Sequence, residues 1–452
     1  MALIKKILIA NRGEIAVRII RACKEMNIPT VAVFSQADRD ALHVQLADEA
    51  VCIGPPNSRD SYMDMQAMLC ACQITGADAL HPGFGFLSES SLFAKVCEQI
   101  GVTFIGPSSQ IIAKMGDKAQ AKITMDMAGV PTIPGSKGTV KDKLDAQKQA
   151  EIIGYPVMIK ASAGGGGRGI RIVKNADEMP SQFDAASSEA KACFGDPSIY
   201  IEKYLENPHH IEVQILADKF GNVVHLGERD CSIQRRNQKV IEESPSPSPI
   251  ITPKLRAKMG ESAKKAAKFV GYSNAGTVEF LVDASGNFYF MEMNTRIQVE
   301  HPVTEMISGI DLVKWQIRIA AGEALTFDQE SISFGGHAIE CRINAENPKV
   351  NFCPCPGMIN KIHFPGGPGI RIETAVKAGQ AITPYYDSMI AKVIAYGDTR
   401  QEALGRMKRA LDEITIDGVN TNLEFQRKLL DNNNVENGIY NTGLLATANI
   451  FS

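Results

Sequence analysis

Short runs of β-branched residues alternate with helical patterns over the first hundred residues. The runs Ile7–Ile9, Thr30–Phe34 and Ala50–Ile53 are separated by stretches in which apolar residues recur every three or four positions. This order of strand, helix and strand predicts an open, mainly parallel sheet. The turn after the first run, Asn11–Glu14, has one glycine and an acidic residue, so a dinucleotide site of the Rossmann type is not expected there.

Length and charge limit the remaining choices. A chain of 452 residues corresponds to roughly three domains at ~150 residues each. Lys and Arg total 48 and Asp and Glu total 51, a net charge of −3, which gives no reason to expect nucleic acid or a membrane surface as a partner. No stretch approaches the ~20 apolar residues of a membrane span. The ten cysteines form no CxxC pair, which favours a cytoplasmic protein.

The pattern changes beyond residue 130, where paired strands dominate. We expect a second, α+β domain there and a third set of strands from about residue 334. The segment Ser244–Pro249, in which Ser and Pro alternate, is interpreted as a stiff, extended spacer before a helix near 253–270.

Four consecutive glycines lie within Lys160–Gly169, between two β runs. The segment is therefore expected to be a hairpin tip and not a strand-to-helix phosphate loop. Glycines let backbone N–H groups approach phosphate oxygens, and Lys160 and Arg168 add positive charge. A flexible hairpin without a ligand is the alternative.

Two further strand-like runs are joined by a four-residue loop. If Asp283 pairs with Phe288 across this loop, the runs form a hairpin. Counting back then places Glu279 opposite Glu292, where two like charges are destabilising unless a cation lies between them. Asn294 falls on the same face and completes an oxygen-rich site for Mg²⁺. A protonated carboxyl group or a shifted register is the alternative.

Arg296, Gln298 and Glu300 follow this hairpin at alternate positions. In a strand they would share one face, which would suit holding a small planar oxyanion and removing its proton. A solvated strand face is the alternative.

Longer motifs are spread over most of the chain. They are Asn11–Ala16, Met115–Lys118, the glycine segment after Lys160, Glu228–Arg236, Met291–His301, Glu340–Asn344 and Tyr385–Met389. Together they resemble the biotin carboxylase family, the ATP-grasp component of biotin-dependent carboxylases. The resemblance extends from Lys5 to about Gly443.

The resemblance implies a fold of the α/β and α+β classes in three parts. These are an N-terminal, Rossmann-like open parallel sheet (residues 1–115), a central ATP-grasp domain (116–333) with a mobile glycine-rich lid (about 131–204), and a C-terminal mixed α+β domain (334–452).

The resemblance also implies roles for residues at matching positions. ATP would be bound by Lys118, Lys160, Gly165, Gly166, Gly167, Glu202, Lys203, Leu205, His210, Gln234, Asn237, Glu279 and Glu292. Mg²⁺ or Mn²⁺ would be held by Glu279, Glu292 and Asn294. Bicarbonate would be bound by Lys239, Arg296, Gln298 and Val299. The catalytic residues would be Glu300 as the base, Arg296, Lys239, and Arg342, which would also bind biotin and stabilise its enolate.

The implied reaction converts bicarbonate and ATP into carboxyphosphate and ADP, and then transfers the carboxyl group to biotin. The chain contains no Met-Lys-Met biotin attachment sequence and no carboxyltransferase region. We therefore expect a free-standing homodimeric subunit that acts on a biotin carboxyl carrier protein and works with carboxyltransferase subunits. Acetyl-CoA carboxylase of fatty acid biosynthesis is the favoured setting, with an acyl-CoA or pyruvate carboxylase as the alternative.

Other interpretations remain open. An ATP-grasp ligase joining an acid to an amine would share the lysines and carboxylates, and a non-catalytic ATP-binding subunit is a third possibility. The chain departs from the family at Asn237, where His is usual, and at Ala163, where Gly is usual. Arg18 would lie near the family's dimer contact, although its place in a predicted helix also suits a solvated side chain.

Overall fold

The computed structural model describes residues 4–162 and 170–447. Over these residues no helix is long and apolar enough to cross a membrane. The N-terminal part is the predicted parallel sheet, with strand order β3-β2-β1-β4-β5. Its strands are β1 (Ile7–Ile9), β2 (Thr30–Ser35), β3 (Glu49–Gly54), β4 (Ala79–His81) and β5 (Thr103–Phe104). Its helices are α1 (Gly13–Glu25), α2 (Leu42–Leu46), α3 (Met65–Thr75), α4 (Ser91–Ile100) and α5 (Ser109–Gly116).

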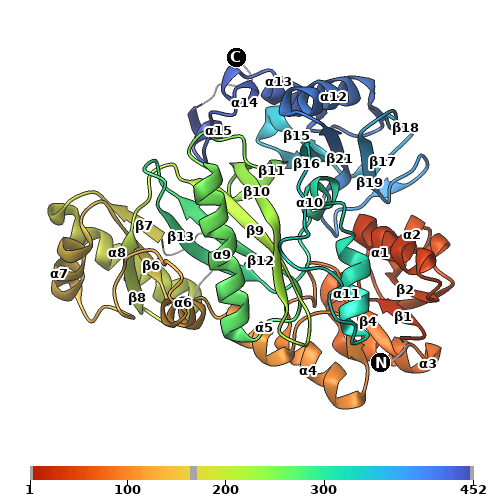
Figure 1. Cartoon of the computed structure of the whole chain (residues 1–452), viewed down its shortest axis with the longest axis horizontal. Helices are drawn as coiled ribbons and strands as arrows, with labels where there is room; N and C mark the ends of the chain where they lie inside the picture. The colour runs from red at the N-terminus through yellow and green to blue at the C-terminus, as the bar shows by residue number, and fades with distance from the viewer. Residues whose placement is uncertain (1–3, 163–169, 448–452) are drawn as a thin grey trace.

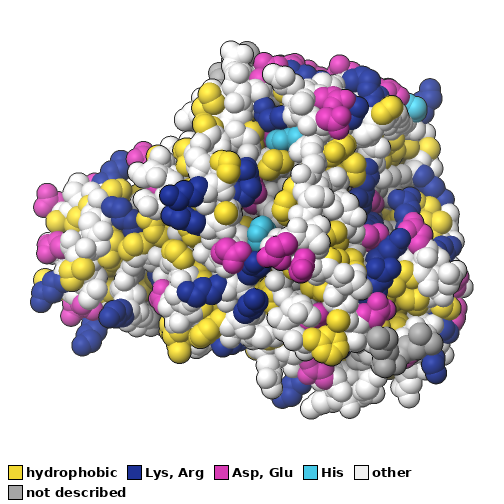
Figure 2. Space-filling model, in the orientation of Figure 1, with side chains coloured by type: hydrophobic (Ala, Val, Ile, Leu, Met, Phe, Trp, Pro, Cys, Tyr) yellow, Lys and Arg dark blue, Asp and Glu magenta, His cyan; other side chains and the backbone are white. Residues whose placement is uncertain are grey.

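A small lobe projects from one side of the molecule, on the left in Figures 1 and 2. It has a three-stranded sheet of order β7-β6-β8, whose two pairings are antiparallel as the sequence predicts for the first pair. The elements here are α7 (Lys143–Ile153), β6 (Val157–Ala161), β7 (Ile170–Val173), α8 (Met179–Phe194) and β8 (Ile199–Lys203). Helix α6 (Lys118–Met127) precedes the lobe and packs with α5 and the apolar core of the large sheet. The tip between β6 and β7, where the glycine run was predicted to cover phosphate, lies outside the described residues.

An eight-stranded sheet of order β13-β12-β9-β10-β11-β14-β21-β19 forms the centre of the molecule. The strands are β9 (His209–Ala217), β10 (Val223–Arg235), β11 (Gln238–Ser244), β12 (Asn274–Val282), β13 (Phe288–Asn294), β14 (His337–Asn344), β19 (Ile370–Thr374) and β21 (Met389–Gly397). Because β11 pairs with β14, the sheet continues across the expected boundary at residues 333 and 334.

Helices cover the sheet on both sides of that junction. Helix α9 (Pro253–Val270) lies across β9 and β10, and α12 (Arg400–Glu413) packs against β21 (Figure 1). The remaining helices are α10 (His301–Ser308), α11 (Leu312–Ala320), α13 (Leu423–Leu430), α14 (Asn433–Glu436) and α15 (Leu444–Thr447). The short C-terminal strands are β15 (Glu346–Asn347), β16 (Cys353–Pro354), β17 (Gly357–Met358), β18 (Lys361–His363), β20 (Ala381–Ile382) and β22 (Thr415–Asp417).

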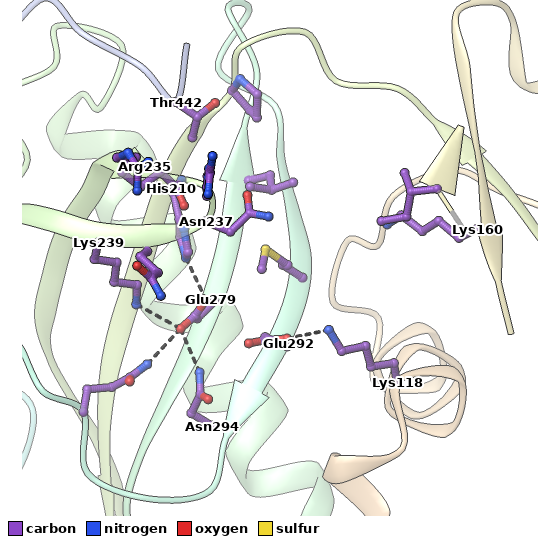
Figure 3. Close-up of a pocket in the computed structure, with 18 of the residues that line it drawn as sticks. Lys118, Lys160, His210, Arg235, Asn237, Lys239, Glu279, Glu292, Asn294 and Thr442 are labelled. Atoms are coloured by element: carbon purple, nitrogen blue, oxygen red, sulfur yellow. Dashed lines mark hydrogen bonds and ion pairs between the residues drawn. The ribbon is translucent and has the colours of Figure 1, made fainter. Parts of the chain in front are cut away.

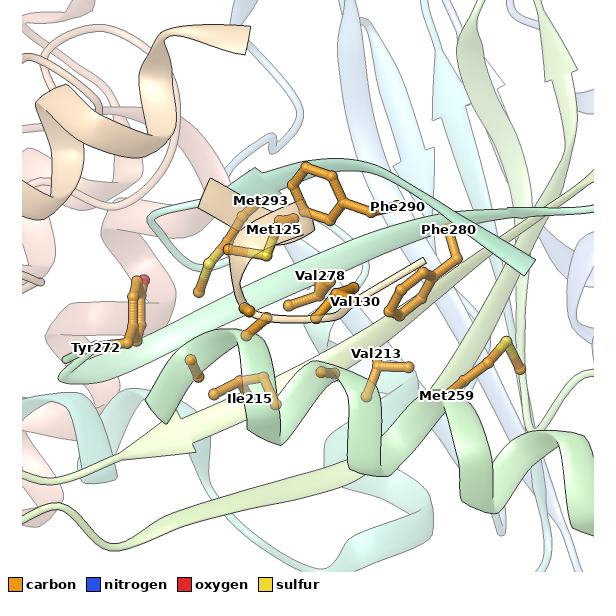
Figure 4. Close-up of a cluster of buried hydrophobic side chains, with 14 of the residues drawn as sticks. Met125, Val130, Val213, Ile215, Met259, Tyr272, Val278, Phe280, Phe290 and Met293 are labelled. Carbon is orange, nitrogen blue, oxygen red and sulfur yellow. The ribbon is translucent and has the colours of Figure 1, made fainter. Parts of the chain in front are cut away.

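Strand β9 shows how the sheet separates its core from its polar face. All nine residues are buried, yet apolar and polar side chains alternate. Ile211, Val213 and Ile215 pack with Met259 of α9 in the largest apolar cluster (Figure 4). His210, Glu212 and Gln214 point to the opposite face, because successive side chains of a strand alternate. This face carries the candidate site.

Three sequence interpretations need correction. Strand β13 ends at Asn294 and α10 begins at His301, so Arg296, Gln298 and Glu300 lie in a loop and not on one strand face. Arg18 is buried and not solvated. The Ser-Pro segment is not a simple spacer, because its three serines are buried and the Ser246 hydroxyl donates to Asp230 at 2.6 Å.

Candidate active site

A cavity of about 2470 Å³ opens between the small lobe, the polar face of the large sheet and the C-terminal strands. Most of the predicted site residues line it, although they come from distant parts of the chain. They are Lys118, Lys160, Glu202, Leu205, His210, Gln234, Asn237, Lys239, Glu279, Glu292, Asn294, Arg296, Gln298, Val299, Glu300 and Arg342. Gly165, Gly166 and Gly167 lie outside the described residues.

Glu279 is the centre of the polar network (Figure 3). One carboxylate oxygen lies 2.7 Å from Nε2 of His210. The other accepts from Asn294 at 2.7 Å, from Gln298 at 2.8 Å and from Lys239 at 3.2 Å. Burial alone would raise the pKa of Glu279, but Lys239 and His210 hold it well below its ordinary value. The carboxylate is therefore ionised at neutral pH.

The hairpin that supplies Glu279 and Glu292 reaches the predicted pairing by a different register. Val282, and not Asp283, lies opposite Phe288, and an irregularity at Met291 then brings Glu279 opposite Glu292. The pairing of the two carboxylates is confirmed, whereas the regular hairpin assumed for it is wrong. The extra residue in β13 shifts the strand pairing by one position. This shift cancels the one-residue difference between the predicted and the observed pairing next to the loop.

The like charges of this pair are already offset by cations of the chain. Glu292 forms an ion pair with Lys118 at 3.1 Å, and Glu279 is paired with Lys239 and His210. Glu292 and Glu279 still present oxygen ligands of the kind that Mg²⁺ prefers, and the Glu292 side chain is 30% exposed. The amide of Asn294 donates to Glu279 and its oxygen accepts from Arg296 at 3.1 Å. The two carboxylates therefore fit a divalent cation, and Asn294 fits once its amide turns.

Lysines of the small lobe and of α6 meet at another carboxylate. Glu202 lies 2.6 Å from Nζ of Lys160 and 2.8 Å from Nζ of Lys122. Burial would raise the pKa of Glu202, and the two ammonium groups lower it. Lys203 is turned away from the cavity, because its Nζ donates to the carbonyls of Gly154 and Tyr155. Lys122 was missed by the sequence reasoning.

Asn237 occupies a tight turn between β10 and β11. Arg235 pairs with Gln238, and the two residues between them have positive φ, 49° for Arg236 and 63° for Asn237. Asn tolerates this left-handed conformation better than most residues. The turn therefore gives a physical reason for Asn at this position.

The loop after β13 collects the predicted oxyanion residues although it is not a strand. The guanidinium of Arg296 donates to Gln298 at 2.8 Å and to Glu89 at 2.9 Å. Glu89 also accepts from the backbone N–H of Thr295 at 3.2 Å. The loop that follows β4 (residues 82–89) thus reaches the site through Glu89.

Glu300 lies between two cations at the end of this loop. Its carboxylate is 2.6 Å from Nζ of Lys239 and 2.9 Å from Nη2 of Arg342. Burial raises the pKa of Glu300, but the charges of Lys239 and Arg342 hold it well below its ordinary value. Arg342 is also paired with Glu242 at 2.5 Å. The predicted base and the predicted biotin residue therefore touch each other.

Two buried residues complete the network and were missed. Glu212 lies 2.6 Å from Nζ of Lys239 and is paired on its other oxygen with Arg229. Arg229 is fully buried and donates to Gln214, Thr304 and Thr277 as well. The alternation of polar and apolar residues in β9 was the available signal, because it places Glu212 beside His210.

Sequence comparisons agree with this geometry over nearly the whole chain. Residues 3–112 match the biotin carboxylase N-terminal domain, residues 117–327 the ATP-binding domain of the carbamoyl-phosphate synthase L chain, and residues 340–447 the biotin carboxylase C-terminal domain. The chain is 56% identical to biotin carboxylase 1 of Bacillus subtilis (strain 168), over 99% of each protein. This chain belongs to the biotin carboxylase family. The predicted fold class and the predicted enzyme class, an ATP-grasp ligase, are confirmed.

A member of the biotin carboxylase family that is named for another carboxylase has a similar sequence identity to this chain. The small subunit of 2-oxoglutarate carboxylase from Hydrogenobacter thermophilus is 53% identical over 98% of this chain and 93% of that protein. A crystal structure of the biotin carboxylase domain dimer of the H. thermophilus enzyme, in complex with MgADP, ADP and bicarbonate, has a TM-score of 0.92. It is 52% identical and covers 99% of this chain and 98% of that one. Family membership therefore does not select the final carboxyl acceptor.

Proposed function

We propose that this chain carboxylates biotin on a separate carrier protein, using MgATP and bicarbonate and releasing ADP and inorganic phosphate. The observation that carries the proposal is the position of Glu300. Its carboxylate is ionised and held by Lys239 and Arg342, beside Arg296 and Gln298, in the same cavity as Lys118, Lys160 and His210. A site that only bound nucleotide would not need a buried base next to an oxyanion pocket.

We infer the following roles for the first half-reaction. Lys118, Lys160 and His210 neutralise the phosphates of ATP, and Arg296 and Gln298 hold bicarbonate near the γ-phosphoryl group. A divalent cation held by Glu279 and Glu292, with Asn294, would supply charge neutralisation for phosphoryl transfer. Glu300 accepts the proton of bicarbonate, whose oxygen attacks phosphorus and gives carboxyphosphate and ADP.

Arg342 links this step to the second one. A strongly lowered pKa makes Glu300 available as a carboxylate but a weak base. When Arg342 turns from Glu300 to the oxygen of the biotin ureido group, the carboxylate loses one ion pair and becomes more basic. The same movement places a guanidinium next to the negative charge that develops on biotin as it accepts the carboxyl group.

The partners belong to the same proposal. A biotin carboxyl carrier protein would present the biotin, carboxyltransferase subunits would use the product, and two copies of the chain would form a dimer in the cytoplasm. Acetyl-CoA carboxylase is the favoured assembly. The named relatives support the general class, which is a subunit of a biotin-dependent carboxylase.

One assay tests the proposal against its alternatives. ADP release is measured with MgATP, bicarbonate and free biotin, each omitted in turn. The proposal requires turnover that depends on bicarbonate and is stimulated by biotin. Turnover that requires an amine indicates an acid–amine ligase, and ATP binding without turnover indicates a non-catalytic subunit; either result contradicts the proposal.

A further inference from the structure

The ammonium of Lys392 lies directly behind the loop that carries Glu300. The side chain is fully buried, at 0% exposure, and its Nζ donates to the backbone carbonyl of Val299 at 2.7 Å. The same Nζ forms an ion pair with Glu14 at 3.2 Å. Because Lys392 belongs to β21 and Glu14 to α1, one ammonium joins the C-terminal strands, the N-terminal part and the active-site loop.

The strand register explains why the ammonium reaches this point. Lys392 lies directly opposite Arg342 of β14 on one side and Glu373 of β19 on the other. Directly opposed side chains share a face of the sheet, so Lys392 and Arg342 both point to the loop. Arg342 holds the carboxylate of Glu300, and Lys392 holds the carbonyl of the preceding residue. Two neighbouring strands thus fix the side chain and the backbone of the same short segment.

The buried charges around Lys392 contribute little to the stability of the fold. Neither carboxylate oxygen of Glu340 has a hydrogen-bond partner among the described residues, and Glu14 has only the ion pair with Lys392 there. Burial raises the pKa of both carboxyl groups, and the charge of Lys392 opposes the shift in each. A buried ion pair of this kind is often no more stabilising than apolar side chains of similar volume. The lysine therefore calls for an explanation other than packing.

We propose that Lys392 is a positioning residue for the reaction of bicarbonate, with Glu14 as the residue that anchors its ammonium. By holding the Val299 carbonyl, Lys392 fixes the peptide that leads into Glu300 and keeps the carboxylate between Lys239 and Arg342. Lys392 does not line the cavity of the described residues, so it acts through the loop and not on substrate. The inference rests on the proposed function, because it assumes that this loop binds bicarbonate.

The test uses the full chain and compares Lys392→Met, Glu14→Gln and the double variant. The matched control is Lys361→Met, which changes an exposed lysine of β18. Bicarbonate-dependent ADP release gives kcat and KM for bicarbonate and for ATP, calorimetry gives the Kd for MgADP, and a melting curve gives Tm. We expect Lys392→Met to lower kcat/KM for bicarbonate at least tenfold, with the Kd for MgADP within twofold of the parent. Glu14→Gln should show a smaller loss in the same direction.

The double variant separates positioning from general damage. If both residues act through one ammonium, the double variant loses no more than Lys392→Met does, since effects within one interacting unit are not additive. Additive losses, unchanged bicarbonate kinetics, or equal losses for both substrates in step with Tm would each overturn the inference.

Two further results would also be informative: a Lys392→Met variant that does not fold, and a parent chain without turnover. If Lys392→Met does not fold, Glu14→Gln decides, because it removes one charge and keeps the shape; unchanged bicarbonate kinetics in a stable Glu14→Gln protein then overturn the inference. Absence of bicarbonate-dependent turnover in the parent chain contradicts the proposed function itself. If the parent turns over normally and the variants have unchanged bicarbonate kinetics, the positioning role is contradicted and the proposed function is not.

Discussion

Individual residues in the site hold one another through ion pairs, and Arg342 is the clearest case. Its guanidinium binds Glu242 and Glu300, and binding of biotin by Arg342 stays a prediction. We expect Arg342→Ala to keep bicarbonate-dependent ATP cleavage and to lose most carboxylation of biotin, about a hundredfold, because a guanidinium aimed at a developing oxyanion contributes about 3 kcal/mol.

Parallel assays of ADP release and carboxybiotin formation measure this difference. Arg39→Ala, which changes an exposed arginine near η1 (Gln36–Asp38), is the control and should leave both rates unchanged. Equal loss of the two rates in a stable protein would show that Arg342 binds bicarbonate or phosphate instead.

Glu292 permits a second test on a single residue. Its only ion pair among the described residues is with Lys118, and the carboxylate is otherwise available to a cation. We expect Glu292→Gln to lose metal-dependent turnover by at least tenfold while Tm stays within a few degrees of the parent. Titration of the rate with MgCl₂ provides the measurement, and Glu330→Gln, an exposed glutamate, is the control. An unchanged magnesium dependence would count against the metal site.

At the scale of elements, buried carboxylates join strands to helices. Glu243 of β11 accepts two hydrogen bonds from Arg400 of α12 at 2.8 Å and lies 2.7 Å from His337 of β14. Burial raises its pKa, but His337 and Arg400 lower it from 4.5 to about 2. Because the folded-state pKa is the lower one, the stabilisation is complete above pH 4.5 and is lost as the pH falls toward 2.

The expected consequence is a stability difference that depends on pH. At pH 7, Glu243→Gln should lower the free energy of unfolding by about 3 kcal/mol, the linkage value for a shift of this size. The gap between parent and variant should close between pH 4.5 and pH 2. Urea unfolding at a series of pH values measures it, and a gap that is constant with pH would contradict the assigned shift.

The elements also show how far the sequence could lead. β-Branched runs placed the parallel strands, and alternation within β9 could have placed His210, Glu212 and Gln214 on one face. Arg296, Gln298 and Glu300 alternate in the same manner, yet they form a loop, because alternation alone does not distinguish a strand from a turn that enters a helix. The irregularity at Met291 and the ion pair between Glu89 and Arg296 depend on contacts across 200 residues or on local backbone geometry, and neither leaves a pattern in the sequence.

At the scale of the whole molecule, Arg18 ties the N-terminal part to the helices that follow the active-site loop. It is paired with Glu305 of α10 at 2.9 Å and with Asp311 at 2.6 Å. We expect Arg18→Ala to lower the free energy of unfolding by about 2 kcal/mol, since Glu305 loses one of its two guanidinium partners and keeps Arg371 at 2.8 Å. Thermal unfolding measures this loss, and an unchanged Tm would contradict it. Arg39→Ala again serves as the control.

The assembly can be tested independently of activity. We expect the chain to sediment as a dimer at micromolar concentration, as proposed from the family. Sedimentation velocity over a range of concentrations is the measurement, and a species of monomer mass throughout that range would contradict the proposal. Because Arg18 binds within its own chain, Arg18→Ala also shows whether its loss changes the dimer or only the fold.

The continuity of the central sheet has a consequence for synthesis of the protein on the ribosome. Strand β11 pairs with β10 on one side, and its second partner, β14, begins only at residue 337. Until then one edge of β11 has no neighbouring strand in the nascent chain. This edge includes the apolar residues Val240 and Ile241. Such an edge can pair with another chain and lead to aggregation. Chaperone demand should therefore peak while residues 245 to 397 are being made, and expression of the first 333 residues alone should give insoluble protein.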